Sequence, residues 1–508
     1  MSCRYITTPI YYVNDRPHLG HAYASIHADV MARYFSAAGH QVFFLTGADE
    51  HGEKIAKAAQ AAGEDIQSFV DRNARLFQDA WHCLDVAPNH FVRTTDAGHQ
   101  HLVGTLLTQL HDAGDIYLAD YEGLYSIGQE RFVTDKELVD GKLPEDRDPP
   151  IVRREANYFF RMEKYRDAIR AHLDSHPELI QPSRYRNEIL QLLDEPIGDL
   201  SISRPRSRLS WGIPIPWDDA HVTYVWFDAL LSYISPLGYP HGEAYQRFWP
   251  AARHVIGKDI LRTHTLFWLS MALAIGIPPY QRLHVSGHLL GADGRKMSKS
   301  LGNGVDPLVA AKRYGIDVLR YTLVREISFG QDGIISNAII EQRLNRDLAN
   351  DLGNLAARSL AMIRQYRAGV VPSPHDYQTI EHQLIEVASA LPARVLELVD
   401  DMKVAQAVER VMEFVRQLNQ YVAQTSPWEL AKQQQAERLD TVLYTLAEGL
   451  RSAADLLAPV MPTKMAQLRC QLGLADGTAW DVQWGCGVVP GQLTYSELLF
   501  EKVASHAT

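Results

Sequence analysis

Two histidines near the start of the chain have the type and spacing to bind phosphate. The sequence His18-Leu-Gly-His21 follows an apolar, strand-like run from Tyr5 to Val13, and a helical pattern begins at Ala22. Gly20 carries no side chain that would block a ligand, and the first turn of a helix offers unpaired N–H groups to an anion. Alone, this pattern is as compatible with a helix cap or an ordinary core histidine as it is with a phosphate site.

Two lysines far along the chain supply a second candidate for phosphate binding. Residues 296–300 read Lys-Met-Ser-Lys-Ser, between Gly291-Ala-Asp-Gly-Arg295 and Leu301-Gly-Asn-Gly304. A glycine-flanked loop with two ammonium groups suits a triphosphate whose charge grows during reaction. The alternative is a solvent-exposed basic loop, in which such pairs of lysines are found more often. Together with the first motif and the sheet pattern between them, phosphate binding is the favoured interpretation.

The segments that must position these residues alternate between strand and helix. Strand patterns at 41–46 and 91–94 precede helical patterns at 53–84, interrupted near Gly63, and at 99–113. Such alternation predicts an α/β fold with a doubly wound parallel sheet and ligands at the carboxyl ends of its strands. Residues 116–222 are rich in turns and predict an insertion. Strand patterns resume at 222–227, 254–256 and 283–286.

The C-terminal half predicts a helix bundle. Apolar residues recur at helical spacing in four runs, separated by proline-containing loops, from about residue 339 to residue 472. The four runs are Leu344–Ile363, Ile380–Val399, Val404–Val422 and Leu439–Leu457. Residues 473–508 have no clear period and stay unassigned.

Bulk composition narrows the class of protein. The 508 residues exceed what one core can hold, and a net charge of −11 requires any nucleic-acid contact to use local basic patches. The four cysteines, Cys3, Cys83, Cys470 and Cys486, form no Cys-x-x-Cys pair, which suits a reducing cytoplasm. No leader pattern and no membrane-spanning apolar run occurs, so we expect a cytoplasmic protein without a membrane partner.

The two motifs together resemble the class I aminoacyl-tRNA synthetases, whose hallmarks they are. Finer matches resemble the methionyl-tRNA synthetases and cover nearly the whole chain, from Tyr5 to about Leu472. These matches are Thr7–Asn14, Gly47–Gly52, Tyr121–Tyr125, Asn157–Phe160, Trp211–Pro216, Val225–Asp228 and Ile256–Ile260.

The resemblance implies a Rossmann-like nucleotide-binding sheet with a connective insertion, followed by an all-α anticodon-binding bundle. The implied domains are 1–115, the first half of the catalytic domain; 116–222, the connective insertion; 223–285, the second half; 286–338, the Lys-Met-Ser-Lys-Ser loop and stem-contact region; and 339–472, the bundle.

The resemblance also implies the reaction, a ligation of methionine to tRNA through an adenylate. Catalysis would consist of positioning and of electrostatic stabilisation of phosphate charge, without a covalent enzyme intermediate. The implied catalytic residues are His18, His21, Lys296 and Lys299. The implied ATP site adds Gly20, Met297, Ser298 and Ser300. ATP would bind as its Mg²⁺ complex.

The family pattern for methionine carries over to seven positions: Ile10, Tyr12, Asp49, Trp226, Tyr233, Ile260 and His264. Asp49 would pair with the ligand ammonium group, although a helix N-cap is the alternative for it. Tyr12, Trp226 and Ile260 would build a slot for the thioether, with core packing as the alternative. His264 would donate to the sulfur or close the far end of the slot.

The chain departs from the family pattern in two places. Leu230 follows Ala229 at a position where the family frequently has proline, so the family pattern does not predict the shape of the nearby pocket wall. Many relatives carry a zinc knuckle after the Tyr121–Tyr125 segment, but the matching positions here are Ser126, Gln129, Leu143 and Asp146. None of these makes a thiolate or imidazole ligand, so we predict a metal-free knuckle and no zinc.

The resemblance implies that the bundle reads the anticodon of tRNA(Met), including the initiator. The implied readers are Asn354, Arg358 and Trp428, because an aromatic platform with Arg and amide donors suits single-stranded RNA. A hydrophobic staple at the helix start is the alternative for Trp428. Arg364 and Arg367 would add phosphate contacts or lie on a solvated helix face. About 35 residues follow the bundle, and we expect a monomer.

Three rival interpretations remain at this point. Cysteine, leucine or valine synthetases share both motifs, but the missing cysteine ligands and the small insertion disfavour them. A small nucleotidyltransferase would share only the first motif and half of the fold. A tRNA-binding protein on a retired synthetase scaffold would not need both motifs intact.

Overall fold

A six-stranded parallel sheet forms the centre of the catalytic region. The computed structural model describes residues 2–127, 131–133, 138–143, 148–297, 302–475, 480 and 483–504. The strand order is β3-β2-β1-β12-β13-β7, and every neighbouring pair is parallel. In that order the strands span His90–Arg93, Gln41–Asp49, Cys3–Tyr12, Ala252–Gly257, Arg282–Ser286 and Ile180–Gln181. The predicted α/β fold is confirmed.

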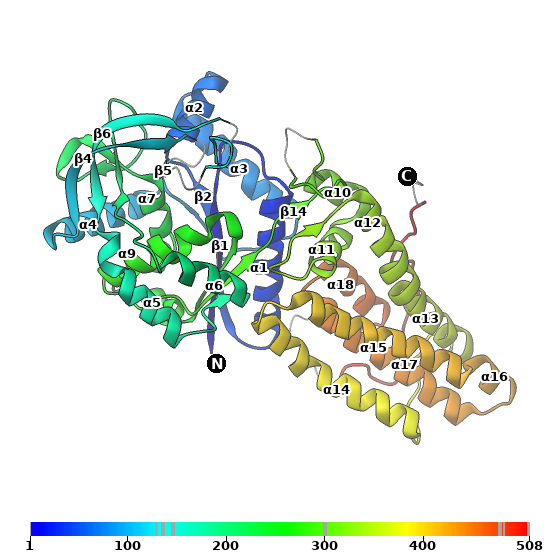
Figure 1. The fold of residues 1–508 in the computed structure, drawn as a ribbon. Helices are drawn as coiled ribbons and strands as arrows, with labels where there is room; N and C mark the ends of the chain where they lie inside the picture. Colours follow the sequence, from blue (N-terminus) through cyan, green and yellow to red (C-terminus); the bar gives the residue numbers. More distant parts are fainter. Residues whose placement is uncertain are drawn as a thin grey trace.

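Helices cover both faces of this sheet. Tyr5 and Ile6 are adjacent on β1 but belong to two different cores, because successive side chains of a strand point to opposite faces. One face packs on α1 (Leu19–Ala37) and α3 (Ile66–Cys83), the other on α4 (Ala97–Asp112) and α9 (Trp268–Ala274) (Figure 1). Two shorter helices are α2 (Glu53–Ala62) and α8 (Glu243–Phe248).

The insertion is a second, antiparallel sheet that lies beside the carboxyl ends of the parallel strands (Figure 1). Its order is β5-β4-β6-β8, with bounds Arg131–Val133, Ile116–Ser126, Ile151–Phe160 and Leu200–Ser201. A three-stranded sheet follows, formed by β9 (Ser203–Pro205), β10 (Pro214–Ile215) and β11 (Asp218–Thr223). Helices α5 (Arg166–Ser175) and α6 (Ser183–Leu192) lie between these strands in sequence.

Part of the predicted insertion returns to the central sheet. Strand β7 falls inside residues 116–222, yet Leu283 and His284 of β13 pair with its two residues. A strand of two residues is too short to leave a period in the sequence.

The expected strand at 222–227 is wrong over most of its length. Strand β11 ends at Thr223, and Val225–Leu231 forms the short helix α7. Six of its seven residues are buried, so the apolar run has no polar face that could distinguish helix from strand. Trp226 therefore projects from the first turn of a helix.

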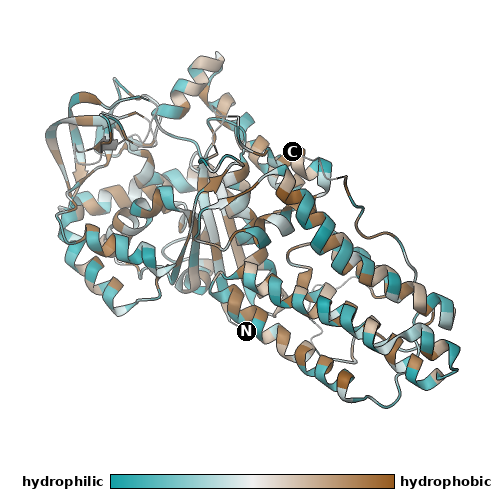
Figure 2. Cartoon of the chain, turned by 45° about the vertical axis from the view of Figure 1, so that its right-hand side comes forward, coloured by the Kyte–Doolittle hydropathy of each residue, from teal (hydrophilic) through white to brown (hydrophobic). Residues whose placement is uncertain are grey.

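The C-terminal half is a helix bundle, as predicted, and its buried apolar residues form one core. Hydrophobic and hydrophilic residues alternate along its helices (Figure 2). A π-helical stretch, Leu344–Gly353, continues directly into α13. The helices are α10 (Pro307–Tyr314), α11 (Ile316–Glu326), α12 (Asn337–Arg343), α13 (Asn354–Arg367), α14 (Thr379–Asp400), α15 (Val404–Thr425), α16 (Pro427–Lys432), α17 (Ala436–Leu457) and α18 (Pro462–Gln471). A two-stranded sheet pairs β14 (Leu289–Leu290), which comes before α10 in the chain, with β15 (Gly333–Ile334), which lies between α11 and α12.

The described part of the unassigned C-terminal segment runs along this bundle. The backbone N–H of Val371 donates to the carbonyl of Gln492 at 2.9 Å, and that of Thr494 donates to Gly369 at 2.8 Å. Val488 and Phe500 are buried in the bundle core. Among the described helices, none is long and apolar enough to cross a membrane.

Candidate active site

A cleft of about 2080 Å³ opens at the carboxyl ends of the parallel strands. Its walls come from the end of β1, the start of α1, α7, the segment after β12 and the insertion. The carboxyl edge of a doubly wound sheet is where such folds bind ligands. The first sequence motif lies in this cleft, as do Lys296 and Met297 of the second.

His18 and His21 stack against each other at the start of α1. Their ring centroids are 3.6 Å apart. Nδ1 of His18 accepts hydrogen bonds from the backbone N–H groups of Gly20 at 3.1 Å and His21 at 3.4 Å. His18 is thus the N-cap of the helix. The sequence left this structural role open as the alternative to phosphate binding. Because Nδ1 accepts, the neutral ring carries its proton on Nε2.

The conformation of this turn favours glycine at position 20. A β-carbon there would lie 3.0 Å from Cε1 of His18 and would displace the ring. Behind the histidines, Tyr11 supports His21 with a ring-centroid distance of 4.7 Å, and its hydroxyl lies 2.9 Å from Oγ of Ser25. Burial raises the pKa of Tyr11 to about 12, so its hydroxyl stays neutral. This is a prebuilt platform at a helix N-terminus.

Tyr12 and Asp49 lie side by side because β1 and β2 are paired in parallel. The two residues are register partners at the ends of their strands. Trp226 from α7 meets the ring of Tyr12 edge-on, with centroids 6.0 Å apart. The N-cap of α2 is Gly52, so the alternative role of Asp49 as a helix cap does not hold. The described structure therefore brings an acidic group and two aromatic rings together.

The other predicted methionine residues divide into lining and backing positions. Ile10 and Ile260 line the cleft with Tyr12 and Trp226. Asp49, Tyr233 and His264 are buried. None of these three residues is among those that line the cleft.

A hydrogen-bond chain defines the state of His264. Its Nδ1 lies 2.9 Å from the carbonyl oxygen of Ile260, which can only accept, so Nδ1 is the donor. Nε2 then accepts from the hydroxyl of Tyr233 at 2.7 Å. Burial lowers the pKa of His264 to about 4, which keeps the ring neutral. Because both ring nitrogens of His264 already have hydrogen-bond partners, the ring is better placed to close the end of the slot than to donate to a sulfur atom.

Lys296 approaches the cleft from the glycine-flanked loop. Its Nζ lies 3.4 Å from Oδ1 of Asp259, and the ring of His288 contacts the same carboxylate. The lysine is exposed, and an exposed ion pair contributes about 0–1 kcal/mol, so a phosphate can replace this partner. Ser298, Lys299 and Ser300 lie outside the described residues.

A buried contact between a carboxylate and two histidines near the slot left no signal in the sequence. Nδ1 of His51 lies 2.7 Å from Oδ2 of Asp228, and Nε2 of His99 lies 3.6 Å from the other carboxylate oxygen. Burial opposes ionisation of Asp228, but the two histidines outweigh it and lower its pKa. His51 and Asp228 stood in segments singled out for resemblance. Their contact, across 177 positions of sequence, leaves no local signal.

Comparison with known proteins identifies the family. The model for "tRNA synthetases class I (M)" matches residues 4–149 and 136–360. Methionine–tRNA ligase of Deinococcus radiodurans is 49% identical over 506 residues, which cover 98% of this chain and 74% of that protein. The chain belongs to the class I methionyl-tRNA synthetases.

Solved structures of the family agree in fold. Mycobacterium tuberculosis methionyl-tRNA synthetase in complex with methionyl-adenylate superposes with a TM-score of 0.94 at 39% identity, covering 98% of this chain and 100% of that one. The apo form of the same enzyme gives a TM-score of 0.87 at 36% identity, with 99% of both chains covered.

The anticodon residues implied by the family lie on the bundle. Asn354 begins α13 and is exposed, and one turn later Nη2 of Arg358 donates to Oδ1 of Asn419 at 2.6 Å. Trp428, in the first turn of α16, is 42% exposed. Arg367 is held by an ion pair to Asp440.

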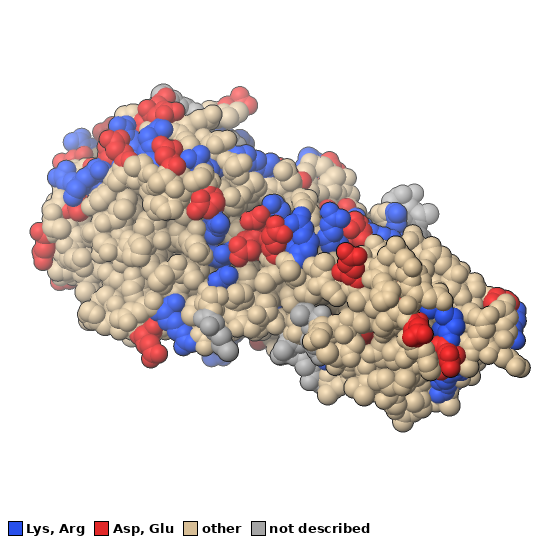
Figure 3. All heavy atoms as spheres, turned by 90° about the horizontal axis from the view of Figure 1, so that it is seen from below, with Lys and Arg blue, Asp and Glu red and all other residues tan. Residues whose placement is uncertain are grey.

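Charge is mixed on one face of the molecule. On the face drawn in Figure 3, lysine and arginine side chains lie next to aspartate and glutamate. Among its described residues, this face has no large area of one charge sign, so any contact with tRNA on it would use local groups of basic side chains.

The described residues of the knuckle region include no metal ligand at the compared positions. Ser126 and Leu143 are buried, and Gln129 and Asp146 lie outside the described residues. Within the described ranges, no group of three His, Cys, Asp or Glu side chains is placed to hold an ion. Neither a serine nor a leucine is a zinc ligand, so the residues that can be compared do not fit the family's zinc.

Proposed function

We propose that this chain is a methionine–tRNA ligase. The observation that carries the proposal is one cleft lined by the stacked histidines at the start of α1 and, beside them, by Tyr12 and Trp226, with the buried Asp49 paired to Tyr12 on the neighbouring strand. A phosphate site adjoining a small aromatic slot with a carboxylate behind it fits activation of a thioether amino acid by ATP.

The first step joins methionine to AMP. A carboxylate oxygen of methionine attacks the α-phosphorus of ATP, the bond to the β-phosphate oxygen breaks, and pyrophosphate leaves with its Mg²⁺. His18 and His21 would stabilise the developing charge together with the helix N-terminus. Lys296 and Lys299 would close over the pyrophosphate from their loop. ATP enters as its Mg²⁺ complex, which is substrate here.

In the second step a hydroxyl of the terminal ribose of tRNA(Met) attacks the acyl carbon, and AMP leaves. Asp49 would hold the methionine ammonium group, while Tyr12, Trp226 and Ile260 would enclose the side chain. The bundle would bind the anticodon through Asn354, Arg358 and Trp428. The domain limits expected from sequence divide these tasks along the chain. We expect the protein to be a cytoplasmic monomer, and light scattering of pure protein would test its oligomeric state.

Pyrophosphate exchange into ATP, measured with each amino acid in turn, tests the activity. Exchange that depends on methionine alone is expected. Exchange with cysteine, leucine or valine would assign the chain to another synthetase of the class. The absence of exchange with every amino acid, alongside retained tRNA binding, would favour the non-catalytic scaffold.

Zinc is proposed to be absent, since Ser126 and Leu143 take the place of ligands. Metal analysis of protein purified without chelators should find well under one zinc per chain. Stoichiometric zinc that survives dialysis would contradict this proposal.

A further inference from the structure

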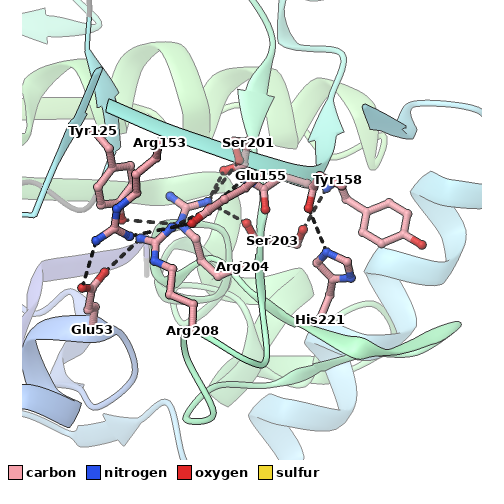
Figure 4. Close-up of polar contacts among 12 residues, drawn as sticks. Glu53, Tyr125, Arg153, Glu155, Tyr158, Ser201, Ser203, Arg204, Arg208 and His221 are labelled. Atoms are coloured by element: carbon pink, nitrogen blue, oxygen red, sulfur yellow. Dashed lines mark hydrogen bonds and ion pairs between the residues drawn. The ribbon is translucent and has the colours of Figure 1, made fainter. Parts of the chain in front are cut away.

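Four charged side chains from three parts of the chain meet between α2 and the insertion (Figure 4). Arg208, in the loop between β9 and β10, donates to Glu155 of β6 at 2.6 Å and to Glu53 of α2 at 2.9 Å. Arg153 of β6 reaches Glu53 at 3.5 Å. We call Glu53, Arg153, Glu155 and Arg208 the Arg208 cluster.

The cluster is largely shielded from water. Its side chains are only 11–15% exposed, and the guanidinium carbons of Arg153 and Arg208 lie 4.5 and 4.3 Å from the ring centroid of Tyr125. Burial opposes ionisation of Glu53, but its hydrogen bonds and cationic neighbours lower its pKa to about 2. Removing one partner from such a cluster leaves charge uncompensated in a dry site.

The loop that carries Arg208 also touches the methionine slot. Three residues later, Nε1 of Trp211 donates to the backbone carbonyl of Glu50 at 2.6 Å. Glu50 directly follows Asp49, the last residue of β2. The loop therefore holds the strand end that presents Asp49, while Arg208 holds α2, which begins four residues beyond it.

The opposite wall of the slot is tied to the same strand end. The ring of Trp211 lies 5.6 Å from that of His51, whose Nδ1 is 2.7 Å from the buried carboxylate of Asp228. Asp228 stands two residues after Trp226 on α7. Pairing of β9 with β11 fixes the start of this helix, since β11 leads directly into it.

We propose that Arg208 is a positioning residue for methionine. By binding Glu53 and Glu155 together, it holds the loop at 206–212 against the end of β2, and so sets the separation of Asp49 and Trp226. This inference rests on the proposed function. Arg208 acts through Glu53 and Trp211, because it is not among the residues that line the cleft.

The test compares Michaelis constants in methionine-dependent pyrophosphate exchange. Arg208→Gln should raise KM for methionine about tenfold, equivalent to about 1.4 kcal/mol. KM for ATP should stay within about twofold, because His18 and His21 are supported by α1 and Tyr11 instead. A merely structural role would lower the fraction of active enzyme and leave both constants unchanged.

Three further variants sharpen the result. Arg206→Gln is the matched control, since Arg206 lies in the same loop but is exposed, and both constants should match wild type. Arg208→Lys keeps the charge without the guanidinium fork, and an intermediate KM for methionine is expected. Trp211→Phe keeps a ring but removes the N–H donated to Glu50, and should raise KM for methionine independently.

The outcomes separate this inference from the proposed function. Wild-type protein without methionine-dependent exchange would overturn the proposed function itself. Wild-type exchange combined with an unchanged KM for methionine in Arg208→Gln, or with parallel rises in both constants, would overturn the role of Arg208. If Arg208→Gln does not fold, Arg208→Lys decides by the same criteria.

Discussion

At the scale of single residues, His18 has two separable tasks. Its Nδ1 caps α1, and the other ring nitrogen is the one proposed to meet phosphate. Asparagine caps helices as well as any residue but has no second ring nitrogen. His18→Asn should therefore keep the melting temperature and lose activity, whereas His18→Ala should lose activity and about 1 kcal/mol of stability. Thermal unfolding and exchange assays on both variants distinguish the two tasks.

His21 and Tyr12 should respond differently to truncation, although both belong to the turn between β1 and α1. His21→Ala removes a charge-stabilising group and should slow adenylate formation by about 10²–10³-fold, roughly 3–4 kcal/mol, with methionine binding retained. Tyr12→Ala opens the slot and should weaken methionine binding first. Single-turnover rates and equilibrium binding of methionine check the pair. Equal loss of binding in both variants would contradict the division into a phosphate site and a slot.

At the scale of elements, the anticodon recognition proposed for the bundle should be separable from the chemistry of the cleft. Trp428→Ala and Arg358→Ala should each lower kcat/KM for tRNA by about 5–150-fold, which corresponds to about 1–3 kcal/mol per stacked base. Pyrophosphate exchange should be unchanged, because it needs no tRNA. Arg410→Ala is the control, since Arg410 lies in the same bundle and pairs locally with Glu413. A fall in exchange would show that the bundle supports the catalytic fold instead.

Helix α11 joins the bundle to the sheet through one buried arginine. Arg320 pairs with Asp29 of α1 at 2.6 Å and donates to the carbonyls of Pro459 and Val460 ahead of α18. Helix α1, which begins at the proposed phosphate site, is thus fastened midway to the bundle. This arrangement makes one continuous core from α1 to α17, instead of two independent units.

At the scale of the whole molecule, buried neutral histidines make stability depend on pH. Burial lowers the pKa of His27 and of His264 to about 4, and lowers those of His254 and His284 well below the ordinary value. In the unfolded chain these rings titrate near 6.5. Between about pH 6.5 and 4 the unfolded state therefore binds more protons, and the free energy of unfolding falls as pH falls.

The expected loss is about 1.4 kcal/mol per such histidine at pH 5.5, relative to pH 8. Melting temperatures across this range should decline, and His27→Leu should reduce the pH dependence by one histidine's share. His241→Gln is the control, because His241 is exposed. A pH dependence of the same size in His27→Leu as in wild type would contradict the assignment.

Local sequence determined the parts of this protein that depend on neighbouring residues. The strand–turn–helix around His18-Leu-Gly-His21, the alternation of strands and helices, and the bundle helices all follow from short-range periodicity and chain stiffness. The family motifs carried the chemistry, because few residue types can bind phosphate at that spacing.

Only the tertiary structure decided the remainder. The apolar run at 225–231 became helix α7 because burial on all sides erases the local period. The proton position on His264 depends on Tyr233, and the Arg208 cluster joins residues up to 155 positions apart. Such contacts form when distant segments are brought together by packing of the sheet, and no stretch of sequence encodes them alone.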